Sequence, residues 1–236
     1  MTDAEAPALS VELVHRVGDI AISLAFQAKR GTTVLFGPSG SGKSTTLAAI
    51  AGLVKPAEGL IRLGDETWLD SKKGYSLAVH KRHVAFVFQS HALFPHMTAL
   101  ANVTYGMSRA LGSDERDARA RKLLEQWRVL HVADRKPRTF SGGEAQRVAL
   151  ARAFATAPRV ILMDEPFSAL DEDLRQTLMR DVKTFIRDLG VPALFVTHSK
   201  SEAEVLGDRV IVLDKGKIVR EGDVRETLAV STPAAT

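Results

Sequence analysis

The sequence has no cysteine and no long apolar run, and each absence excludes a class of protein. Without cysteine the chain forms neither a disulfide nor a thiolate metal site, as is usual in a reducing compartment. The longest apolar stretches, residues 47–54 and 160–163, fall far short of the roughly 18 residues that span a bilayer. The first ten residues lack the basic run and apolar core of a secretory signal. We therefore expect a cytosolic protein whose membrane association is peripheral.

The chain also carries little net charge. Lys and Arg total 32 against 28 Asp and Glu, a formal charge of +4, which is too small and too dispersed to indicate nucleic-acid binding. The densest basic stretch, residues 116–138, also holds acids and is interpreted as a solvated helix face. With 45% hydrophobic and 25% charged residues over 236 positions, the composition is that of a folded globular protein of one or two domains.

Short apolar runs alternate with helical stretches along most of the chain, which is the pattern of a parallel α/β sheet. Such runs occupy residues 32–36, 84–88, 160–163, 193–197 and 209–213. Residues 99–132 hold no strand-like run, and their helical periodicity breaks at Gly112, which predicts a helical insertion in the sheet domain. Near the end, Asp214, Lys215 and Gly216 predict a hairpin turn.

A glycine-rich loop follows the first of these runs and opens a helix. It fits the phosphate-loop pattern G-x-x-x-x-G-K-[ST], in which backbone N–H groups and a helix N-terminus surround phosphate oxygens. We expect Lys43 to reach the β- and γ-phosphates, and Ser44 to place its hydroxyl on Mg²⁺. The alternative is a chance match in a Gly/Ser-rich turn, expected about once in a hundred such chains. The predicted phosphate-binding residues are Gly37, Pro38, Ser39, Gly40, Ser41, Gly42, Lys43, Ser44 and Thr45.

Two adjacent acids end the apolar run at residues 160–163. In open α/β sheets, ligands bind at the carboxyl ends of the strands, so we assign Asp164 to the metal and Glu165 to the activation of water. His198 follows another apolar run and should emerge at the same edge, where it contacts the γ-phosphate or orients Glu165. The alternative readings are a solvated strand end for the acids and a structural role for the histidine.

The segment F-S-G-G-E-A-Q-R at residues 140–147 closely resembles the signature motif of ABC ATPases. Ser141, Gly142 and Gly143 head a predicted helix at residues 144–157 and form a second anion site. In that family, this site acts in trans on nucleotide held by a partner subunit, which implies a homodimer with nucleotide at the interface. The resemblance further identifies Gln89 as the Q-loop glutamine and a metal ligand, residues 168–171 as the D-loop, and His198 as the switch histidine.

Residues 70–74, 81–89, 93–96 and 102–107 resemble the ATPase subunit of molybdate importers, with sulfate-type importers as close kin. Three departures stand out. The signature has Phe140 in place of the usual Leu and Glu144 in place of Gln, and Val17 occupies the position of the aromatic residue that stacks on adenine. Those importers often carry a C-terminal oxyanion-binding domain, which we do not expect in this chain.

The resemblance implies a single ABC ATPase domain over residues 1–236. Residues 1–90 and 158–236 are expected to form a RecA-like core with an antiparallel β subdomain, and residues 91–157 the helical signature subdomain. The implied function is hydrolysis of MgATP at the cytoplasmic face of the membrane, coupled to oxyanion import. The implied partners are integral membrane permease subunits and, indirectly, an extracytoplasmic substrate-binding protein, with no nucleic acid.

Three alternatives stay open at this point: an exporter, a soluble ABC ATPase that acts on DNA or ribosomes, and a nucleotide-binding interaction protein without turnover. The apolar residues that follow Gln89, namely Phe94, Pro95 and Met97, either contact the permease or pack onto the helical insertion.

Overall fold

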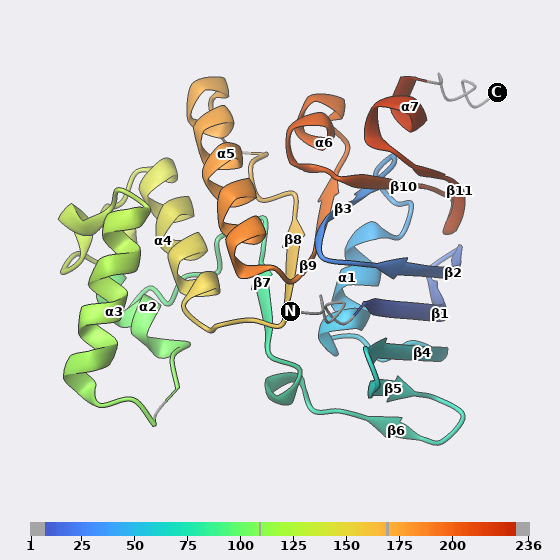
Figure 1. Cartoon of the computed structure of the whole chain (residues 1–236), viewed down its shortest axis with the longest axis horizontal. Helices are drawn as coiled ribbons and strands as arrows, with labels where there is room; N and C mark the ends of the chain where they lie inside the picture. Colours follow the sequence, from blue (N-terminus) through green and yellow to red (C-terminus); the bar gives the residue numbers. More distant parts are fainter. Residues whose placement is uncertain (1–7, 109, 169, 230–236) are drawn as a thin grey trace, which may run out of the picture.

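The structure is a computed structural model, and it describes residues 8–108, 110–168 and 170–229. Its centre is a six-stranded sheet in the order β11-β10-β3-β9-β8-β7 (Figure 1). Neighbouring strands from β10 to β7 run parallel, and β11 is antiparallel to β10. The predicted parallel core and its terminal hairpin are confirmed. The strands are β3 (Gly31–Phe36), β7 (Val84–Val87), β8 (Val160–Asp164), β9 (Pro192–Thr197), β10 (Arg209–Asp214) and β11 (Lys217–Gly222).

A second, antiparallel sheet in the order β2-β1-β4-β5-β6 lies beside the first, on the right in Figure 1. Buried and exposed residues alternate along β1 and β2, so one face of this sheet packs against the core and the other faces solvent. The antiparallel β subdomain implied by the family resemblance is therefore present. Its strands are β1 (Leu9–Val17), β2 (Ile20–Ala28), β4 (Glu58–Leu63), β5 (Glu66–Asp70) and β6 (Tyr75–Ser76).

The helices of the described residues fall into three groups (Figure 1). Helices α2, α3 and α4 pack together at one end of the molecule, α5, α6 and α7 lie on one face of the parallel sheet, and α1 covers the opposite face. None of them combines the length and the apolar character needed to span a bilayer. They are α1 (Lys43–Ala51), α2 (Ala99–Tyr105), α3 (Ser113–Gln126), α4 (Gly142–Phe154), α5 (Glu172–Leu189), α6 (Lys200–Leu206) and α7 (Val224–Ala229).

Two helix boundaries bear on the sequence predictions. Helix α3 begins directly after Gly112, as the break in periodicity predicts. The signature helix was expected over residues 144–157, and that expectation is wrong at both ends. Helix α4 begins at Gly142 because the Ser141 side chain caps it, and it ends at Phe154, three residues before Ala157 takes a left-handed φ of 47°.

The core consists of two layers separated by the parallel sheet. Successive side chains of a strand point to opposite faces, so Val34 packs with the layer under α5 and α6, whereas Leu35 packs with α1 and the antiparallel sheet. Ile161 and Leu162 on β8 divide in the same way. Burial on both faces explains why the parallel strands are continuous apolar runs.

The segment that follows Gln89 packs onto the helical group. The Phe94 ring lies 4.6 Å from the Tyr105 ring, and its backbone N–H donates to the Asn102 side chain at 2.8 Å. Arg152 places its guanidinium 5.5 Å from the Phe94 ring centre. Of the two sequence interpretations of this segment, packing onto the helical insertion accounts for Phe94.

One buried cation joins α1 to the antiparallel sheet. Arg82 is 1% exposed, and its guanidinium lies over Trp68 at 6.0 Å from the ring centre. It reaches oxygens from three segments that are far apart in sequence. Its donors bond to the carbonyls of Ala49 (3.1 Å), Ile50 (2.6 Å), Trp68 (3.2 Å) and Leu77 (3.1 Å) and to the Ser76 hydroxyl (3.3 Å). The last carbonyls of α1 are satisfied by this side chain.

We predict that Arg82→Met lowers the free energy of unfolding by about 3 kcal/mol, because it removes the donor of the Ile50 and Leu77 carbonyls, at about 1–3 kcal/mol each. The Ala49 and Trp68 carbonyls keep backbone donors. Urea denaturation followed by circular dichroism measures the change. The matched control is Arg62→Met, since Arg62 is exposed and should change the free energy by about 0.5 kcal/mol at most. Equal stability of the two variants would contradict the role of Arg82.

Candidate nucleotide-binding site

The phosphate loop lies between the end of β3 and the start of α1. It packs closely against both sheets. Gly37 has a φ of 154°, and a Cβ there would lie 2.2 Å from the carbonyl oxygen of Leu213. Gly42 has a φ of 96°, and a Cβ there would lie 2.9 Å from the Ile22 side chain. Neither position accepts a side chain without displacing its neighbour, so the glycines allow the loop to curl tightly.

Lys43 folds back into the curve of its own loop. Its Nζ donates to the carbonyl oxygens of Gly37 at 2.8 Å and Pro38 at 2.7 Å, and the residue is 4% exposed. Burial lowers the pKa of Lys43 from its ordinary value, and the nearby Glu165 and Asp164 carboxylates oppose that shift. The loop therefore holds a partly desolvated cation where an anion would bind.

The two acids predicted at the end of β8 take different positions. The Ser44 hydroxyl donates to Oδ1 of Asp164 at 2.9 Å, and burial raises the pKa of Asp164 above its ordinary value. Glu165 adopts a left-handed φ of 43°, uncommon outside glycine, and its backbone N–H donates to the Val196 carbonyl at 3.1 Å. The left-handed residue turns the chain at the strand end, where functional residues are often found.

Ser44 and Asp164 fit a magnesium ion. Mg²⁺ prefers hard oxygen ligands and commonly takes one or two from the protein and the rest from phosphates and water. A hydroxyl and a carboxylate oxygen 2.9 Å apart beside the phosphate loop provide such a set. Gln89, the third predicted ligand, donates from Nε2 to the Ser168 hydroxyl at 3.3 Å.

Ser168 connects Gln89 to the acid pair. Its hydroxyl donates to the Glu165 carbonyl at 3.1 Å, so the Q-loop glutamine and the acid strand are linked through one side chain. Of the remaining D-loop residues, Ala169 lies outside the described part of the chain. Asp171 accepts from the Leu174 backbone N–H at 3.0 Å and caps α5.

His198 lies beside Glu165, with Nδ1 3.2 Å from Oε1 of that carboxylate. A pair that the sequence analysis missed holds the histidine in place: buried Thr197 donates to Oε2 of Glu202 at 2.5 Å. The same Thr197 hydroxyl accepts from the Ser199 backbone N–H at 3.0 Å. The signal for this pair was an acid in the first turn of a helix that follows a buried strand.

A cavity of about 270 Å³ opens over the phosphate loop. Its wall includes Val17, at the position predicted for adenine stacking, and two residues from β2, Ile20 and Ile22, that the sequence analysis did not name. Arg16, which donates from Nε to the Gly18 carbonyl at 3.1 Å, is not part of the wall. The described lining is Val17, Ile20, Ile22, Ser39, Gly40, Gly42, Lys43, Ser44, Thr45 and Glu165.

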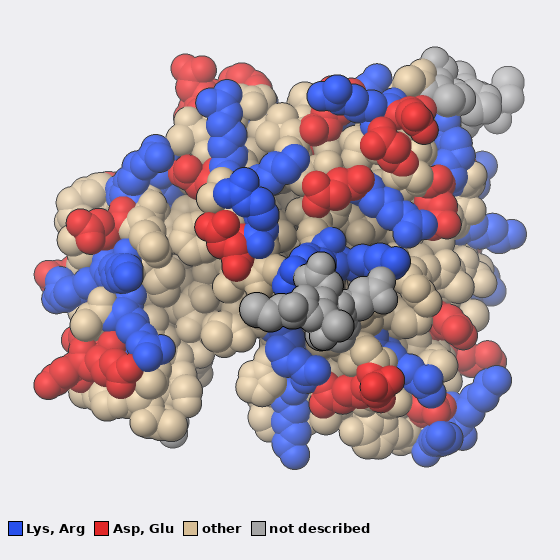
Figure 2. Space-filling view, viewed as in Figure 1, with Lys and Arg blue, Asp and Glu red and all other residues tan. Residues whose placement is uncertain are grey.

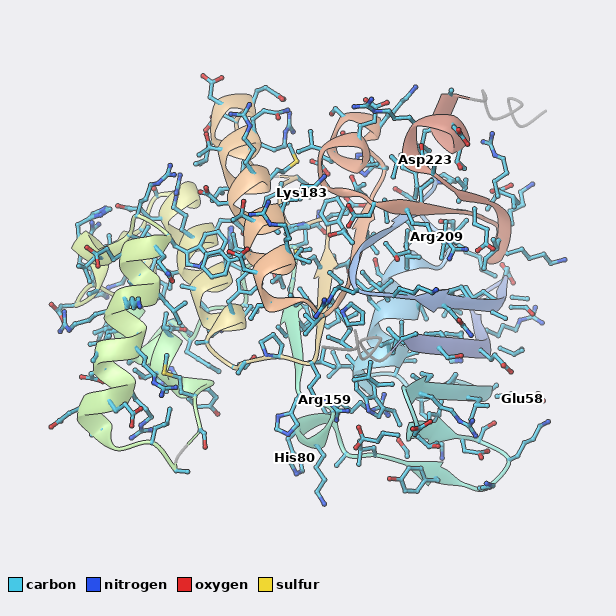
Figure 3. The ribbon with its side chains drawn as sticks, viewed as in Figure 1. Glu58, His80, Arg159, Lys183, Arg209 and Asp223 are labelled. Atoms are coloured by element: carbon cyan, nitrogen blue, oxygen red, sulfur yellow. The ribbon has the colours of Figure 1, made fainter. Side chains whose placement is uncertain are left out.

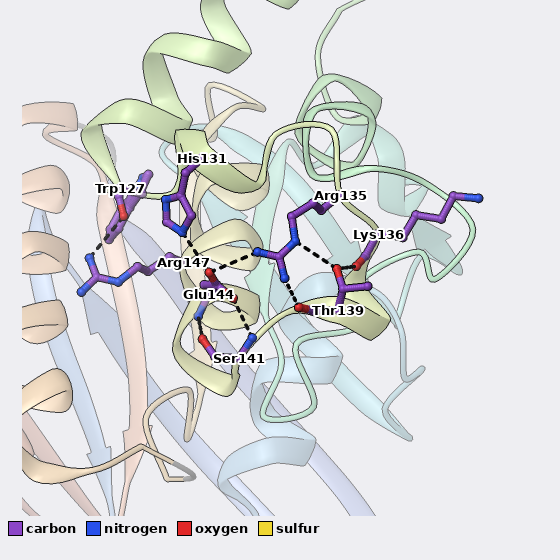
Figure 4. Close-up of polar contacts among 8 residues, drawn as sticks. All are labelled: Trp127, His131, Arg135, Lys136, Thr139, Ser141, Glu144 and Arg147. Atoms are coloured by element: carbon purple, nitrogen blue, oxygen red, sulfur yellow. Dashed lines mark hydrogen bonds and ion pairs between the residues drawn. The ribbon is translucent and has the colours of Figure 1, made fainter.

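The signature residues form a separate site at the start of α4 (Figure 4). Ser141 and Glu144 make a capping box, in which the Glu144 N–H donates to the Ser141 hydroxyl at 3.2 Å and the Ser141 N–H donates to the Glu144 carboxylate at 2.7 Å. His131 Nε2 lies 2.9 Å from the same carboxylate, and Arg135 lies 3.7 Å from it. None of Ser141, Gly142 and Gly143 belongs to the described lining of the cavity over the phosphate loop.

The Glu144 carboxylate is therefore engaged at the start of its own helix. The Ser141 N–H and then the His131 ring hold the pKa of Glu144 below its ordinary value. Arg135 also donates to the Thr139 carbonyl and, at 3.3 Å, to its hydroxyl. The departure from the usual glutamine is accommodated because the carboxylate is bound by its own helix and by two neighbouring basic side chains.

The fold and this site define a phosphate-loop α/β protein with an antiparallel side sheet and a helical arm in which α4 starts at a capping box. A sequence profile described as ABC transporter matches residues 21–168, more than half of the chain. The chain belongs to the ABC transporter family. The predicted family and fold are thus confirmed.

The chain is similar to named relatives over most of its length. A molybdenum import ATP-binding protein from Pseudomonas savastanoi is 43% identical over 199 residues, covering 84% of this chain and 55% of that protein. A molybdate/tungstate import ATP-binding protein from Archaeoglobus fulgidus is 41% identical over 218 residues, covering 92% and 88%. The chain spans about half the length of the molybdenum import relatives that it matches.

A solved structure has the same fold. The dimeric structure of MJ0796, described as a bacterial ABC transporter cassette, superposes with a TM-score of 0.78 and 33% identity, covering 92% of this chain and 99% of that one. The same cassette is known as a dimer in a post-hydrolysis state bound to ADP and Pi.

We predict that the stabilisation due to the Glu144 charge disappears in acid. A carboxyl whose pKa is lowered by folding stabilises the protein above its unfolded pKa of about 4.3, and that stabilisation is lost as the pH falls through the folded pKa. The native chain should therefore exceed Glu144→Gln in unfolding free energy by about 1 kcal/mol at pH 7, with the difference shrinking below about pH 4. Urea titrations at a series of pH values measure it.

The matched control is Glu58→Gln. Glu58 lies exposed at the start of β4 and is labelled in Figure 3. Its substitution should leave the unfolding free energy unchanged across the same range. A Glu144→Gln difference that does not vary with pH would show that the carboxylate is not charged against its partners.

Proposed function

We propose that this chain is the ATP-hydrolysing subunit of an ABC importer and that it works as a homodimer. One observation carries the proposal: two residues that line the cavity over the phosphate loop each contact a second functional side chain, since Ser44 donates to the Asp164 carboxylate and Glu165 lies next to the His198 ring. A phosphate loop alone suits nucleotide binding. The carboxylate beside an imidazole supplies a base for attack by water, which hydrolysis requires.

The loop is assigned to the phosphates. Its N–H groups, at the N-terminus of α1, suit the oxygens of a triphosphate, and Lys43 supplies a cation that is already desolvated. Ser44 and Asp164 would hold Mg²⁺, with Gln89 completing the set. When bound, the ion neutralises phosphate charge. Val17, Ile20 and Ile22 form the apolar wall available to the base.

Glu165 is assigned as the general base. Its carboxylate accepts a proton from water as the water oxygen attacks the γ-phosphorus, and the bond to the β-phosphate oxygen breaks to release ADP. His198, 3.2 Å from that carboxylate, orients it and contacts the γ-phosphate. Thr197 and Glu202 position the histidine from the start of α6.

The signature residues are assigned to a partner subunit's nucleotide. Ser141, Gly142 and Gly143 present a hydroxyl and open N–H groups at a helix start, and they stand apart from the chain's own cavity. Two chains paired head to tail would bring each signature site against the other chain's phosphate loop. The dimeric form of the MJ0796 cassette supports this arrangement.

The proposed transport role is import of an oxyanion of the molybdate type. It is supported by the names of the Pseudomonas and Archaeoglobus relatives. In this proposal residues 91–157 form the helical subdomain that contacts the permease at the cytoplasmic face, and an extracytoplasmic binding protein delivers the anion. Purification of the tagged chain from membranes, with identification of the bound permease, tests the transport role separately from hydrolysis.

We predict that Glu165→Gln retains ATP binding and loses at least about 100-fold in steady-state hydrolysis, because the amide keeps the shape but accepts no proton. Phosphate release measures turnover, and nucleotide titration measures affinity. Glu58→Gln, remote from the cavity, should hydrolyse ATP at the native rate. Turnover of Glu165→Gln within tenfold of the native rate would refute the assignment of the base.

We predict that MgATP turns Glu165→Gln from a monomer into a dimer, because ATP is part of the interface and hydrolysis no longer removes it. Adding Gly142→Asp should keep the protein monomeric, because a carboxylate then faces the γ-phosphate. A Cβ at Gly142 meets no atom within 4 Å, so the substitution leaves the fold intact. Size-exclusion chromatography with and without MgATP measures the state.

Gly142→Ala in the Glu165→Gln background is the matched control, since it adds the Cβ without the charge and should still dimerise with MgATP. If the aspartate variant dimerises as completely as the alanine variant, the signature does not bind phosphate in trans.

A further inference from the structure

A second cavity, of about 410 Å³, lies on the far side of the parallel sheet's strands from the phosphate loop, at the edge where β3 begins. It lies among β3, the second half of α5 and the end of α6. Lys183 marks it in Figure 3, between α5 and α6. Its described lining is Arg30, Gly31, Thr32, Arg180, Lys183, Thr184, Ile186, Arg187, Val205 and Asp208.

The rim of this cavity carries more basic than acidic side chains. Its lining holds Arg30, Arg180, Lys183 and Arg187 against one carboxylate, Asp208, while over the rest of α5 basic and acidic side chains are mixed (Figure 2). Within the described residues Arg30, Arg180 and Lys183 form no ion pair, while Arg187 pairs with exposed Asp188 at 3.5 Å.

The groups on the rim are held in place by backbone contacts. Arg30 donates to the Gly190 carbonyl at 2.9 Å, and Lys183 donates to the Val205 carbonyl at 2.8 Å. Asp208 accepts the Thr32 backbone N–H at 2.8 Å, so its carboxylate is already engaged. Arg180 is exposed and makes no polar contact among the described residues. The charges are thus positioned while most of their donors stay available.

The floor of the cavity is apolar, and an apolar floor favours an organic anion over an inorganic one. Ile186 is 2% exposed, and Val205 adds a second aliphatic surface. A bare inorganic anion gains nothing from such a floor, whereas an organic ligand buries its body there. Guanidinium groups in general stack on aromatic rings and bind phosphate through paired donors, and three of them line this cavity. A volume of this size is ordinary for a small-molecule site.

Three elements that border the cavity run directly to the nucleotide site. Strand β3 ends at Phe36, one residue before the phosphate loop. Helix α6 begins at Lys200, two residues after His198, and α5 begins after its cap Asp171, close to Ser168 and Glu165. A ligand that bridges the end of α6 and the middle of α5 therefore restrains the helix that follows His198.

We propose that this cavity is a second ligand site for an aromatic phosphate of the size of a nucleoside monophosphate, and that its occupancy slows ATP turnover. The phosphate lies among Arg180, Lys183 and Arg187, and the ring lies on Ile186 and Val205 beneath Arg30. Binding of this ligand does not depend on the proposed ATPase activity. The effect on ATP turnover does rest on that proposed activity.

Calorimetric titration with adenosine monophosphate (AMP) tests the binding. The titrated chain carries Lys43→Ala, which removes the cation of the phosphate loop and isolates the second site. We expect one saturable site, an affinity at least tenfold lower when Arg180→Ser and Lys183→Ser are added, and no change with the matched exposed pair Lys55→Ser and Arg62→Ser. Inorganic phosphate should bind at least tenfold more weakly than AMP, because it lacks the ring.

Absence of saturable AMP binding, or equal affinity in the Arg180→Ser, Lys183→Ser chain, would overturn the site. Equal binding of inorganic phosphate would overturn the aromatic assignment. In the chain with native Lys43, AMP should slow ATP hydrolysis at least twofold, and the Arg180→Ser, Lys183→Ser chain should resist it. Inhibition that persists in that variant would place AMP at the phosphate loop instead. Binding is measured without turnover, so a failure of the ATPase proposal leaves the binding result interpretable.

Discussion

The tight closure of the phosphate loop is the constraint on which the rest of the structure depends. Gly37 abuts the Leu213 carbonyl at the end of β10, and Gly42 abuts the Ile22 side chain on β2. One residue from each sheet therefore packs closely against the loop. The tight curve of the loop depends on the positions of both sheets. The Ser23 N–H, which donates to the Gly216 carbonyl at 2.8 Å, joins β2 to the β10–β11 turn beside this contact. The antiparallel sheet thus forms one wall of the loop.

Burial shifts the pKa values of two charged groups at the site in opposite directions. Desolvation lowers the pKa of Lys43 and raises that of Asp164, so both groups are poised to gain from a ligand that restores neutrality. A triphosphate with its metal ion matches this need, since it brings negative charge to the lysine and a cation to the carboxylate. At the start of α4 the charged group is an acid, Glu144. The Ser141 N–H, His131 and Arg135 surround that carboxylate and compensate its charge.

Features that depend on neighbouring residues were predictable from the sequence, and features built from distant segments were not. The phosphate loop, the acids after β8 and the β10–β11 hairpin each follow from a continuous run of residues, and the structure has them. The antiparallel sheet followed only from the family resemblance, because alternation along β1 and β2 indicates half-buried strands but does not identify the strands that they pair with. The Arg82 contacts, the apolar wall of β2 and the basic cavity join segments that belong to different elements of the chain. The hydrophobic periodicity of one segment carries no information about which other segments it contacts. The start of α4 was misplaced for a smaller reason, since two glycines look like loop until the capping box is recognised.

Helix α5 ties the signature helix to the acid strand. At its first turn, Leu174 lies where a Cβ on Gly143 would be 2.4 Å away, so α4 meets α5 at closest approach. Farther along α5, the Phe185 ring stacks on Trp127 with centres 4.9 Å apart, and Trp127 stacks on Phe154 at the end of α4. Both ends of the signature helix are therefore fastened to one helix, whose cap Asp171 follows the segment that contacts Gln89 and Glu165. Because packed interiors resist compression, these contacts hold the helical arm and α5 as one packed unit. The start of that unit lies beside the acid pair.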